Sequence, residues 1–208
     1  ISKLTNLKSL SLNNSNISGL LPYSLMNLKN LTHLNLSDNN LRGPLPYSIH
    51  LLNNLEYLNL SDNNLEGLIP VELYKLKNLK HLNLSQNNLK GSIDKEIKNL
   101  PKLETLSISN NNLTGSIPHE LFSNRNLKFI NFENNQLSGT LHHKLYEIPN
   151  ISFLKVGGNN FEGNISKNIC KLDIDFSNIE YFNIANNSFC APYPNCIKNY
   201  VGTQGNCE

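Results

Sequence analysis

The chain has 208 residues, a hydrophobic share of 38% and a formal net charge of +2. This balanced charge gives no indication of a nucleic-acid-binding surface, and no apolar run approaches the ~20 residues that cross a bilayer as a helix. We therefore expect neither a nucleic-acid partner nor a membrane span within the chain. The first residues already follow the repeat described next, so we expect the native start of the protein, and an N-terminal cap, to precede residue 1.

A segment of 24 residues recurs along the chain. Each copy begins with Leu or Ile and has apolar residues three and five positions later, as in Leu31, Leu34 and Leu36. This alternation is typical of a short strand with one face toward a core, and we expect the strands of successive copies to pair in parallel. The last step is 28 residues, with the extra residues near 173–176, and the copies begin at Leu7, Leu31, Leu55, Leu79, Leu103, Leu127, Ile151 and Ile179.

An asparagine follows the strand in seven copies, eight positions after the first residue. Its amide offers two donors and an acceptor, so it can satisfy backbone groups that are left unpaired where the chain turns inward. The first copy has Ser15 instead, which suits an irregular terminal unit. The seven structural asparagines are Asn39, Asn63, Asn87, Asn111, Asn135, Asn159 and Asn187.

The second half of each copy has a different pattern. A glycine follows in copies one to seven, and apolar pairs such as Leu73 and Leu76 then predict one short helical turn. Because one copy cannot bury its apolar side alone, the copies must stack. A proline precedes the turn at Pro22, Pro46, Pro70 and Pro118, and is replaced at Asp94, His142 and Ser166.

The pattern L-x-x-L-x-L-x-x-N-x-L, followed by L-x-G-x-I-P as in residues 113–118, resembles the plant-type leucine-rich repeat. That class forms the ectodomains of receptor-like kinases and receptor-like proteins, and the secreted polygalacturonase inhibitors. The resemblance implies an α/β solenoid, a right-handed superhelix of about eight repeats with a parallel β-sheet on its concave face. We expect this solenoid to span residues 1–187.

Four cysteines lie in the last fifth of the chain: Cys170, Cys190, Cys196 and Cys207. An even, clustered set favours disulfides in an oxidising compartment. The alternative is a metal site, but no histidine lies among them and their spacing lacks the paired steps of zinc modules. Residues 186–196 resemble the closing segment of the family, which implies a C-terminal cap over residues 188–208 with the pairs Cys190–Cys196 and Cys170–Cys207.

Outward-pointing side chains of the predicted strands form the concave face, where we expect a ligand to bind. The residue two positions into each copy forms a column of rings, and aromatic side chains are enriched at binding hot spots. Alternatively, rings simply suit exposed strands. Glu133 and Lys155 interrupt the neighbouring polar columns, where variation would encode specificity. The candidate ligand-binding residues are His33, Tyr57, His81, Phe129, Glu133, Phe153, Lys155 and Tyr181.

Asparagines in N-x-[ST] motifs mark possible glycosylation sites of a secreted protein. Those at Asn35, Asn59 and Asn83 belong to the repeated strand motif and are explained as by-products of the repeat. Five others lie off the predicted strand face, where a glycan would not obstruct a ligand. We expect several of these to carry sugar: Asn16, Asn30, Asn112, Asn150 and Asn164.

Catalysis has little support in the sequence. No Ser or Cys nucleophile has an evident base, no glycine-rich phosphate loop follows a strand, and no paired carboxylates recur. We therefore expect no enzyme activity, no catalytic residues, no cofactor and no metal site.

The leading functional hypothesis is an extracellular recognition module, secreted or at the cell surface, that binds a protein or peptide ligand. The resemblance adds a co-receptor or a cell-wall-degrading enzyme as further candidate partners. Three alternatives stay open: a secreted enzyme inhibitor similar to the polygalacturonase inhibitors, a structural or adhesive matrix protein, and an ice-binding protein that orders water on its asparagine array.

Overall fold

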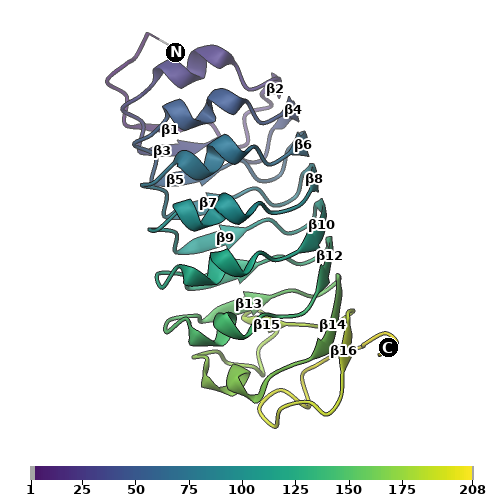
Figure 1. Ribbon diagram of the computed structural model, residues 1–208. Coiled ribbons are helices and arrows are strands. Elements are labelled where there is room, and N and C mark those ends of the chain that lie inside the picture. The colour runs from purple at the N-terminus through teal and green to yellow at the C-terminus, as the bar shows by residue number, and fades with distance from the viewer. Residues whose placement is uncertain (1–2, 208) are drawn as a thin grey trace.

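The computed structural model describes residues 3–207, which form a single stack of coils (Figure 1). The predicted solenoid of about eight repeats is confirmed. Its predicted outer limits, residues 1 and 208, lie outside the described residues. None of the helical turns in the described range has the length and hydrophobicity of a membrane span.

The first sheet contains parallel strands from eight successive copies. Equivalent residues pair, for example Leu34 with Leu58 and Leu58 with Leu82. The apolar residue of each strand is buried and its neighbours are more exposed, as the alternation predicts. The strands follow in chain order: β1 (Ser9–Ser11), β3 (His33–Asn35), β5 (Tyr57–Asn59), β7 (His81–Asn83), β9 (Thr105–Ser107), β11 (Phe129–Asn131), β13 (Phe153–Lys155) and β15 (Phe182–Asn183).

A second parallel sheet runs along another side of the stack (Figure 1) and is not predicted from the sequence. Its residues are rich in Asn, Gly and Ser, which have low strand propensity. Most of its pairs link residues 22 apart, such as Arg42 and Asn64, instead of 24 as in the first sheet. Its strands are β2 (Ser18–Gly19), β4 (Asn40–Pro44), β6 (Asn64–Leu68), β8 (Asn88–Gly91), β10 (Asn112–Ser116), β12 (Gln136–Gly139), β14 (Asn160–Asn164) and β16 (Ser188–Cys190).

The repeated asparagines join each coil to the preceding one. The Nδ2 group of Asn63 donates to the carbonyls of Leu60 and Ser61 in its own copy, and to that of Leu36 in the preceding copy. Its Oδ1 accepts from the backbone N–H of Leu41, at 2.9 Å. Because the side chain is buried, these bonds replace water for backbone groups that would otherwise be unpaired. The same pattern recurs at the other six asparagines.

Within residues 3–207, seven 3-10 turns follow the second-sheet strands, where the sequence predicts short helical turns. Where proline is absent, its replacement caps the turn: the side chains of Asp94, His142 and Ser166 each accept a hydrogen bond from the backbone N–H two residues later. The three departures from the repeat therefore preserve the start of the turn by a different means. The turns are η1 (Tyr23–Asn27), η2 (Tyr47–Leu51), η3 (Val71–Lys75), η4 (Lys95–Asn99), η5 (His119–Ser123), η6 (His143–Glu147) and η7 (Lys167–Lys171).

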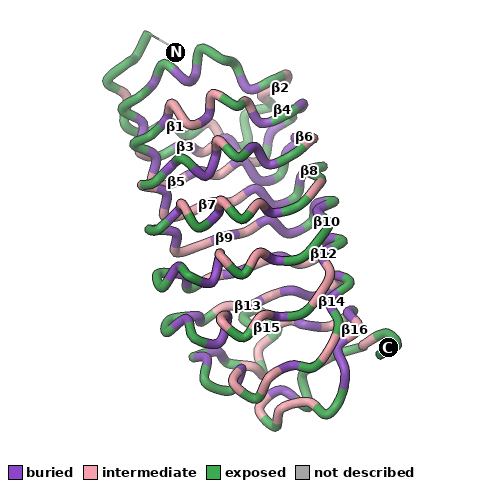
Figure 2. The backbone as a smooth tube through the Cα atoms, viewed as in Figure 1, coloured by how far each residue is buried: buried purple, intermediate pink, exposed green. Residues whose placement is uncertain are grey.

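Buried positions recur along the whole stack (Figure 2), and their side chains, mostly Leu, Ile and Phe, form one continuous core. Two tyrosines extend into it. The hydroxyls of Tyr74 and Tyr146 are buried, and neither has a hydrogen-bond partner within the described residues. Burial raises the pKa of Tyr74, and raises that of Tyr146 to about 12. Each hydroxyl is therefore desolvated without compensation.

The last copy departs from the predicted alignment. Ile179, expected to begin the copy as a core residue, is 61% exposed, whereas its counterpart Ile151 is fully buried. The inserted segment instead supplies Ile174 to the core and Phe176, whose ring packs edge-on against Phe182 at 4.9 Å between centroids. The extra residues thus provide the apolar contacts that the alignment assigned to Ile179.

The cysteines form two disulfides, but the expected pairs are wrong. Cys170 bonds to Cys196 and Cys190 to Cys207, with Cα–Cα distances of 5.7 and 5.2 Å. The pairs Cys190–Cys196 and Cys170–Cys207, which the family resemblance implied, are not formed. All four predicted cysteines are therefore used, in a different connectivity.

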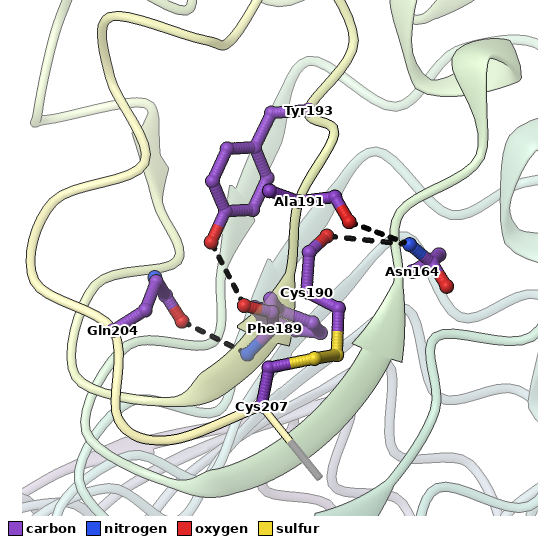
Figure 3. The surroundings of a disulfide bond; sticks show 7 residues. All are labelled: Asn164, Phe189, Cys190, Ala191, Tyr193, Gln204 and Cys207. Carbon is purple, nitrogen blue, oxygen red and sulfur yellow. Dashed lines mark hydrogen bonds between the residues drawn. A yellow bond between two sulfur atoms is a disulfide. The ribbon is translucent and has the colours of Figure 1, made fainter.

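Strand register explains this connectivity. β16 pairs with β14 so that Cys190 lies opposite Asn164, and the same offset of 26 residues brings Cys196 beside Cys170. The tail then forms a parallel bridge between Asn187 and Gln204, and this offset of 17 residues brings Cys207 beside Cys190. Figure 3 shows the Cys190–Cys207 disulfide. Beside it, the side chain of Gln204 accepts a hydrogen bond from the backbone N–H of Phe189.

Candidate functional site

The predicted ring column lies on the first sheet. Its members occupy the first position of successive strands and pair in register from His33 to Phe153, so their side chains point the same way. Tyr181 lies just before β15. His33 and Tyr181 are exposed and the other rings are half-buried. The structure therefore places the rings predicted from the sequence on one face, at His33, Tyr57, His81, Phe129, Phe153 and Tyr181.

The rings contact one another along the stack and form two groups. In the first group, the centroids of His33 and Tyr57 are 6.0 Å apart and nearly parallel, and Tyr57 and His81 are also 6.0 Å apart, tilted by 50°. In the second, Phe129 and Phe153 stack at 3.7 Å, and Tyr181 meets Phe153 edge-on at 6.5 Å. A ligand would therefore meet mostly ring edges, because neighbouring rings cover most of the ring faces.

A gap separates the two groups at Thr105, which has the column position on β9. The imidazole Nδ1 of His81 lies 2.9 Å from the Thr105 hydroxyl. Above Thr105 is a hollow of about 250 Å³, lined by the rings of the two groups and by polar residues of the adjacent column. Thr105 is not among the candidate residues predicted from the sequence, although a small residue in a column of rings is a visible signal. The hollow is lined by Tyr57, Leu58, His81, Leu82, Asn83, Thr105, Ser107 and Phe129.

A column of amides runs beside the rings in the first half of the stack. The Oδ1 atoms of Asn35, Asn59 and Asn83 accept from backbone N–H groups two residues later, at 3.0–3.1 Å. Within the described residues, their NH₂ groups form no hydrogen bond to the protein. This face therefore presents donors to acceptor groups such as peptide carbonyls.

Glu133 and Lys155, predicted as specificity residues, come together beside the second ring group. Their charged atoms are 4.0 Å apart and both side chains are largely buried, at 19% and 13% exposure. Asn183 donates to Glu133 at 2.6 Å, and it lies where a Cβ on Gly157 would stand, so Gly157 makes room for this contact. Lys155 also lies 5.3 Å from the centroid of the Phe153 ring, within cation–π range. The two charges largely neutralise each other.

Two further ion pairs lie one residue before the strands. Lys80 contacts Glu56 at 2.7 Å, and Lys128 contacts Glu104 at 2.6 Å. The hydrogen bond from Lys80 lowers the pKa of Glu56, and that from Lys128 lowers the pKa of Glu104. Because both pairs are exposed, they contribute little stability, but they leave the edge of the ring column with alternating, balanced charge.

A separate apolar patch lies on the flank formed by the second sheet and the turns. Leu68 is 61% exposed and its side chain lies over Gly91, where a Cβ would meet it at 2.5 Å. Beside it is a hollow of about 480 Å³ between the second and third copies. The exposed apolar side chains of this flank are Leu20, Tyr23, Tyr47, Leu68 and Val71. The patch is not predicted from the sequence.

The five predicted glycosylation asparagines are all exposed. Two have engaged side chains: the amide of Asn30 donates to the carbonyl of Thr5, and that of Asn164 to the carbonyls of Cys190 and Ala191. Asn16, Asn112 and Asn150 make no such side-chain bond within the described part of the chain. For the same range, residues 3–207, no three His, Cys, Asp or Glu side chains lie close enough to hold a metal ion.

Comparison with sequence families shows repeats of one kind. Models described as leucine-rich repeats match residues 6–28, 30–52, 46–89 and 77–124. No curated protein sequence gives a significant match.

Among solved structures, the chain is similar to the ectodomains of two Arabidopsis receptor kinases. GASSHO1/SCHENGEN3, in complex with CASPARIAN STRIP INTEGRITY FACTOR 2, is 32% identical with a TM-score of 0.84 over 90% of this chain and 22% of its own. HAESA, in complex with the peptide hormone IDA and the co-receptor SERK1, is 29% identical with a TM-score of 0.88 over 97% and 34%. This chain thus spans about a fifth to a third of those ectodomains.

A plant ice-binding protein is also similar, at 26% identity and a TM-score of 0.75. The match covers 100% of this chain and 75% of that protein.

Proposed function

Since this chain belongs to the leucine-rich-repeat family and carries the plant type of repeat, we propose that it is an extracellular recognition module that binds a peptide or protein ligand on its first sheet. Two disulfides support an extracellular setting, because such bonds persist in oxidising compartments. A receptor ectodomain or a secreted relative of one fits this role.

The observation that carries the proposal is the ring column. Aromatic side chains bury large areas at low entropic cost when they are already held in place, and here each ring is supported by its neighbours. The free amide donors of the adjacent column suit the carbonyls of an extended peptide. In the solved complexes named above, HAESA binds the peptide hormone IDA and GASSHO1/SCHENGEN3 binds CASPARIAN STRIP INTEGRITY FACTOR 2, and these complexes support a ligand-binding role for the same scaffold here.

The test is selection of peptides from a displayed library on the disulfide-bonded chain, followed by affinity measurement on variants. We expect Phe153→Ala, which removes half of the stacked pair, to weaken binding by about tenfold or more. Tyr47→Ala is the matched control, because Tyr47 is an exposed aromatic residue of the flank that belongs to η2 and not to the first sheet. Equal affinity of the two variants, or no peptide bound at micromolar concentration, would contradict the proposal.

Ice binding is the second candidate, and the likeness to the plant ice-binding protein favours it. The unpaired amide donors at regular strand spacing could order water, as an ice-binding surface must. The rings and the Glu133–Lys155 pair interrupt that regularity over the second half of the sheet. Measurement of ice recrystallisation separates the candidates: inhibition that is lost in Asn59→Leu would favour ice binding over peptide recognition.

For glycosylation, we propose Asn16, Asn112 and Asn150 as the favoured acceptors, because their amides are exposed and free of protein hydrogen bonds within the described residues. Mass spectrometry of the secreted chain before and after enzymatic deglycosylation tests this assignment. Full occupancy at Asn30 and Asn164, with the other three unmodified, would contradict it.

A further inference from the structure

The ring column has one vacant position. Rings or imidazoles occupy the column in every copy from His33 to Tyr181 except at Thr105. We propose that the ligand fills this position with a single uncharged aromatic side chain, tyrosine or tryptophan, inserted between His81 and Phe129. This inference rests on the proposed function, and it names the ligand group that the site selects.

Spacing sets the number of rings that fit. Thr105 pairs in register with both His81 and Phe129, so these two residues are two strand spacings apart, about 9.6 Å. A ring placed midway would lie about 4.8 Å from each, inside the 4.5–7 Å range of favourable aromatic pairs. One ring therefore completes the column, and a second has no room.

The volume of the hollow agrees with that count. An engineered cavity of about 150 Å³ holds one benzene molecule, and the hollow above Thr105 is about 250 Å³. The Thr105 hydroxyl is already bonded to His81, which fixes one wall. The face of Phe129 that points toward Thr105 is the one not covered by Phe153.

The surrounding charges decide the chemistry of the occupant. The nearby carboxylates, Glu56 and Glu104, are each neutralised by a lysine at 2.6–2.7 Å. Because both carboxylates are paired, neither offers an unpaired negative charge that would bind the guanidinium group of a ligand arginine. Asn83 and Ser107 line one side of the hollow and can meet a phenol hydroxyl or an indole N–H. The occupant is therefore aromatic, uncharged and equipped with one polar atom.

The experiment uses side-chain analogues and NMR spectroscopy. p-Cresol, indole and methylguanidinium are titrated separately, and the ring signals of His81 and Phe129 are followed. We expect saturable shifts with p-cresol and indole in the wild type and in Thr105→Val, which preserves size and branching, and none in Thr105→Phe, which fills the gap with the protein's own ring. Tighter binding of methylguanidinium, no saturable shift, or unchanged shifts in Thr105→Phe would each overturn the inference.

Further measurements keep the test independent of folding and of the proposed function. If Thr105→Phe does not fold, Phe129→Leu removes one wall instead and should weaken p-cresol binding by roughly 2- to 10-fold; an unchanged affinity overturns the inference. Library-selected peptides whose affinity is the same for Thr105→Phe and wild type would also overturn it, while leaving peptide recognition by the first sheet intact. Saturable p-cresol binding without any peptide ligand would support the site and count against the proposed function.

Discussion

Replacing Asn63 by alanine should destabilise the fold far more than replacing its neighbour Asn64. Asn63 donates to three carbonyls and accepts from one N–H while buried, whereas Asn64 is exposed. Because the Asn63 amide has only two N–H hydrogens for its three carbonyl partners, we count two donated bonds and one accepted bond, at about 1 kcal/mol net each. The orphaned N–H of Leu41 adds a further ~1–2 kcal/mol, for a loss of about 4–5 kcal/mol.

The assay is thermal unfolding of matched variants followed by circular dichroism. For a chain of this length each kcal/mol shifts Tm by about 2–4 °C, so we expect Asn63→Ala to melt about 10 °C or more below Asn64→Ala. Asn63→Asp is the sharper variant, because it keeps the shape but turns oxygens toward carbonyls, and it should be at least as damaging. If Asn63→Asp is tolerated, or if Asn63→Ala and Asn64→Ala melt together, the side chain only fills space and the hydrogen-bond reasoning fails.

Three smaller predictions concern single positions. Burial and then the neighbouring histidines lower the pKa of His142 below its ordinary value of 6.5. Because the folded state resists protonation of this imidazole, the free energy of unfolding should fall as the pH drops below 6.5. The Tm of His142→Asn, which keeps a capping side chain, should therefore fall less than that of the wild type between about pH 7 and pH 5. Tyr74→Phe removes a buried hydroxyl that lies near the Asp94 backbone but forms no hydrogen bond with it. We expect this change to raise the free energy of unfolding by up to about 1 kcal/mol, measured by urea denaturation. A clear decrease in that free energy would show that the hydroxyl has a hydrogen-bond partner. Gly43→Ala and Gly19→Ala should each cost about 1–2 kcal/mol, because both positions have positive φ and the exposed Leu20 side chain that the new Cβ would meet at Gly43 can move aside; a clearly larger loss at Gly43 would show that Leu20 is held in place.

The predictable features are those that the repeat spacing encodes directly. A leucine every second residue and an asparagine at a fixed distance require one strand and one inward bend per copy, and the structure contains both. The column of rings follows by counting, because residues at the same position of a copy pair in register.

The features that were missed depend on contacts between copies. The second sheet is built from residues of low strand propensity, so only the pairing of neighbours makes them strands. The disulfide pairs depend on two different register offsets, which analogy with a family motif does not specify. The alignment predicts Ile179 as a core residue, but Ile179 is exposed, and Ile174 of the inserted segment is buried in the last copy instead.

The unequal register of the two sheets has a consequence for any partner. Successive strands of the first sheet pair without slip, while those of the second slip by two residues, about 6.6 Å along the strand. If successive coils shift along the strand on one side of the stack and stay aligned on the other, each coil must be rotated slightly relative to the one before it. A rigid, planar object could then rest on only a few neighbouring layers, whereas a supple linear molecule could follow the turning surface from one end to the other.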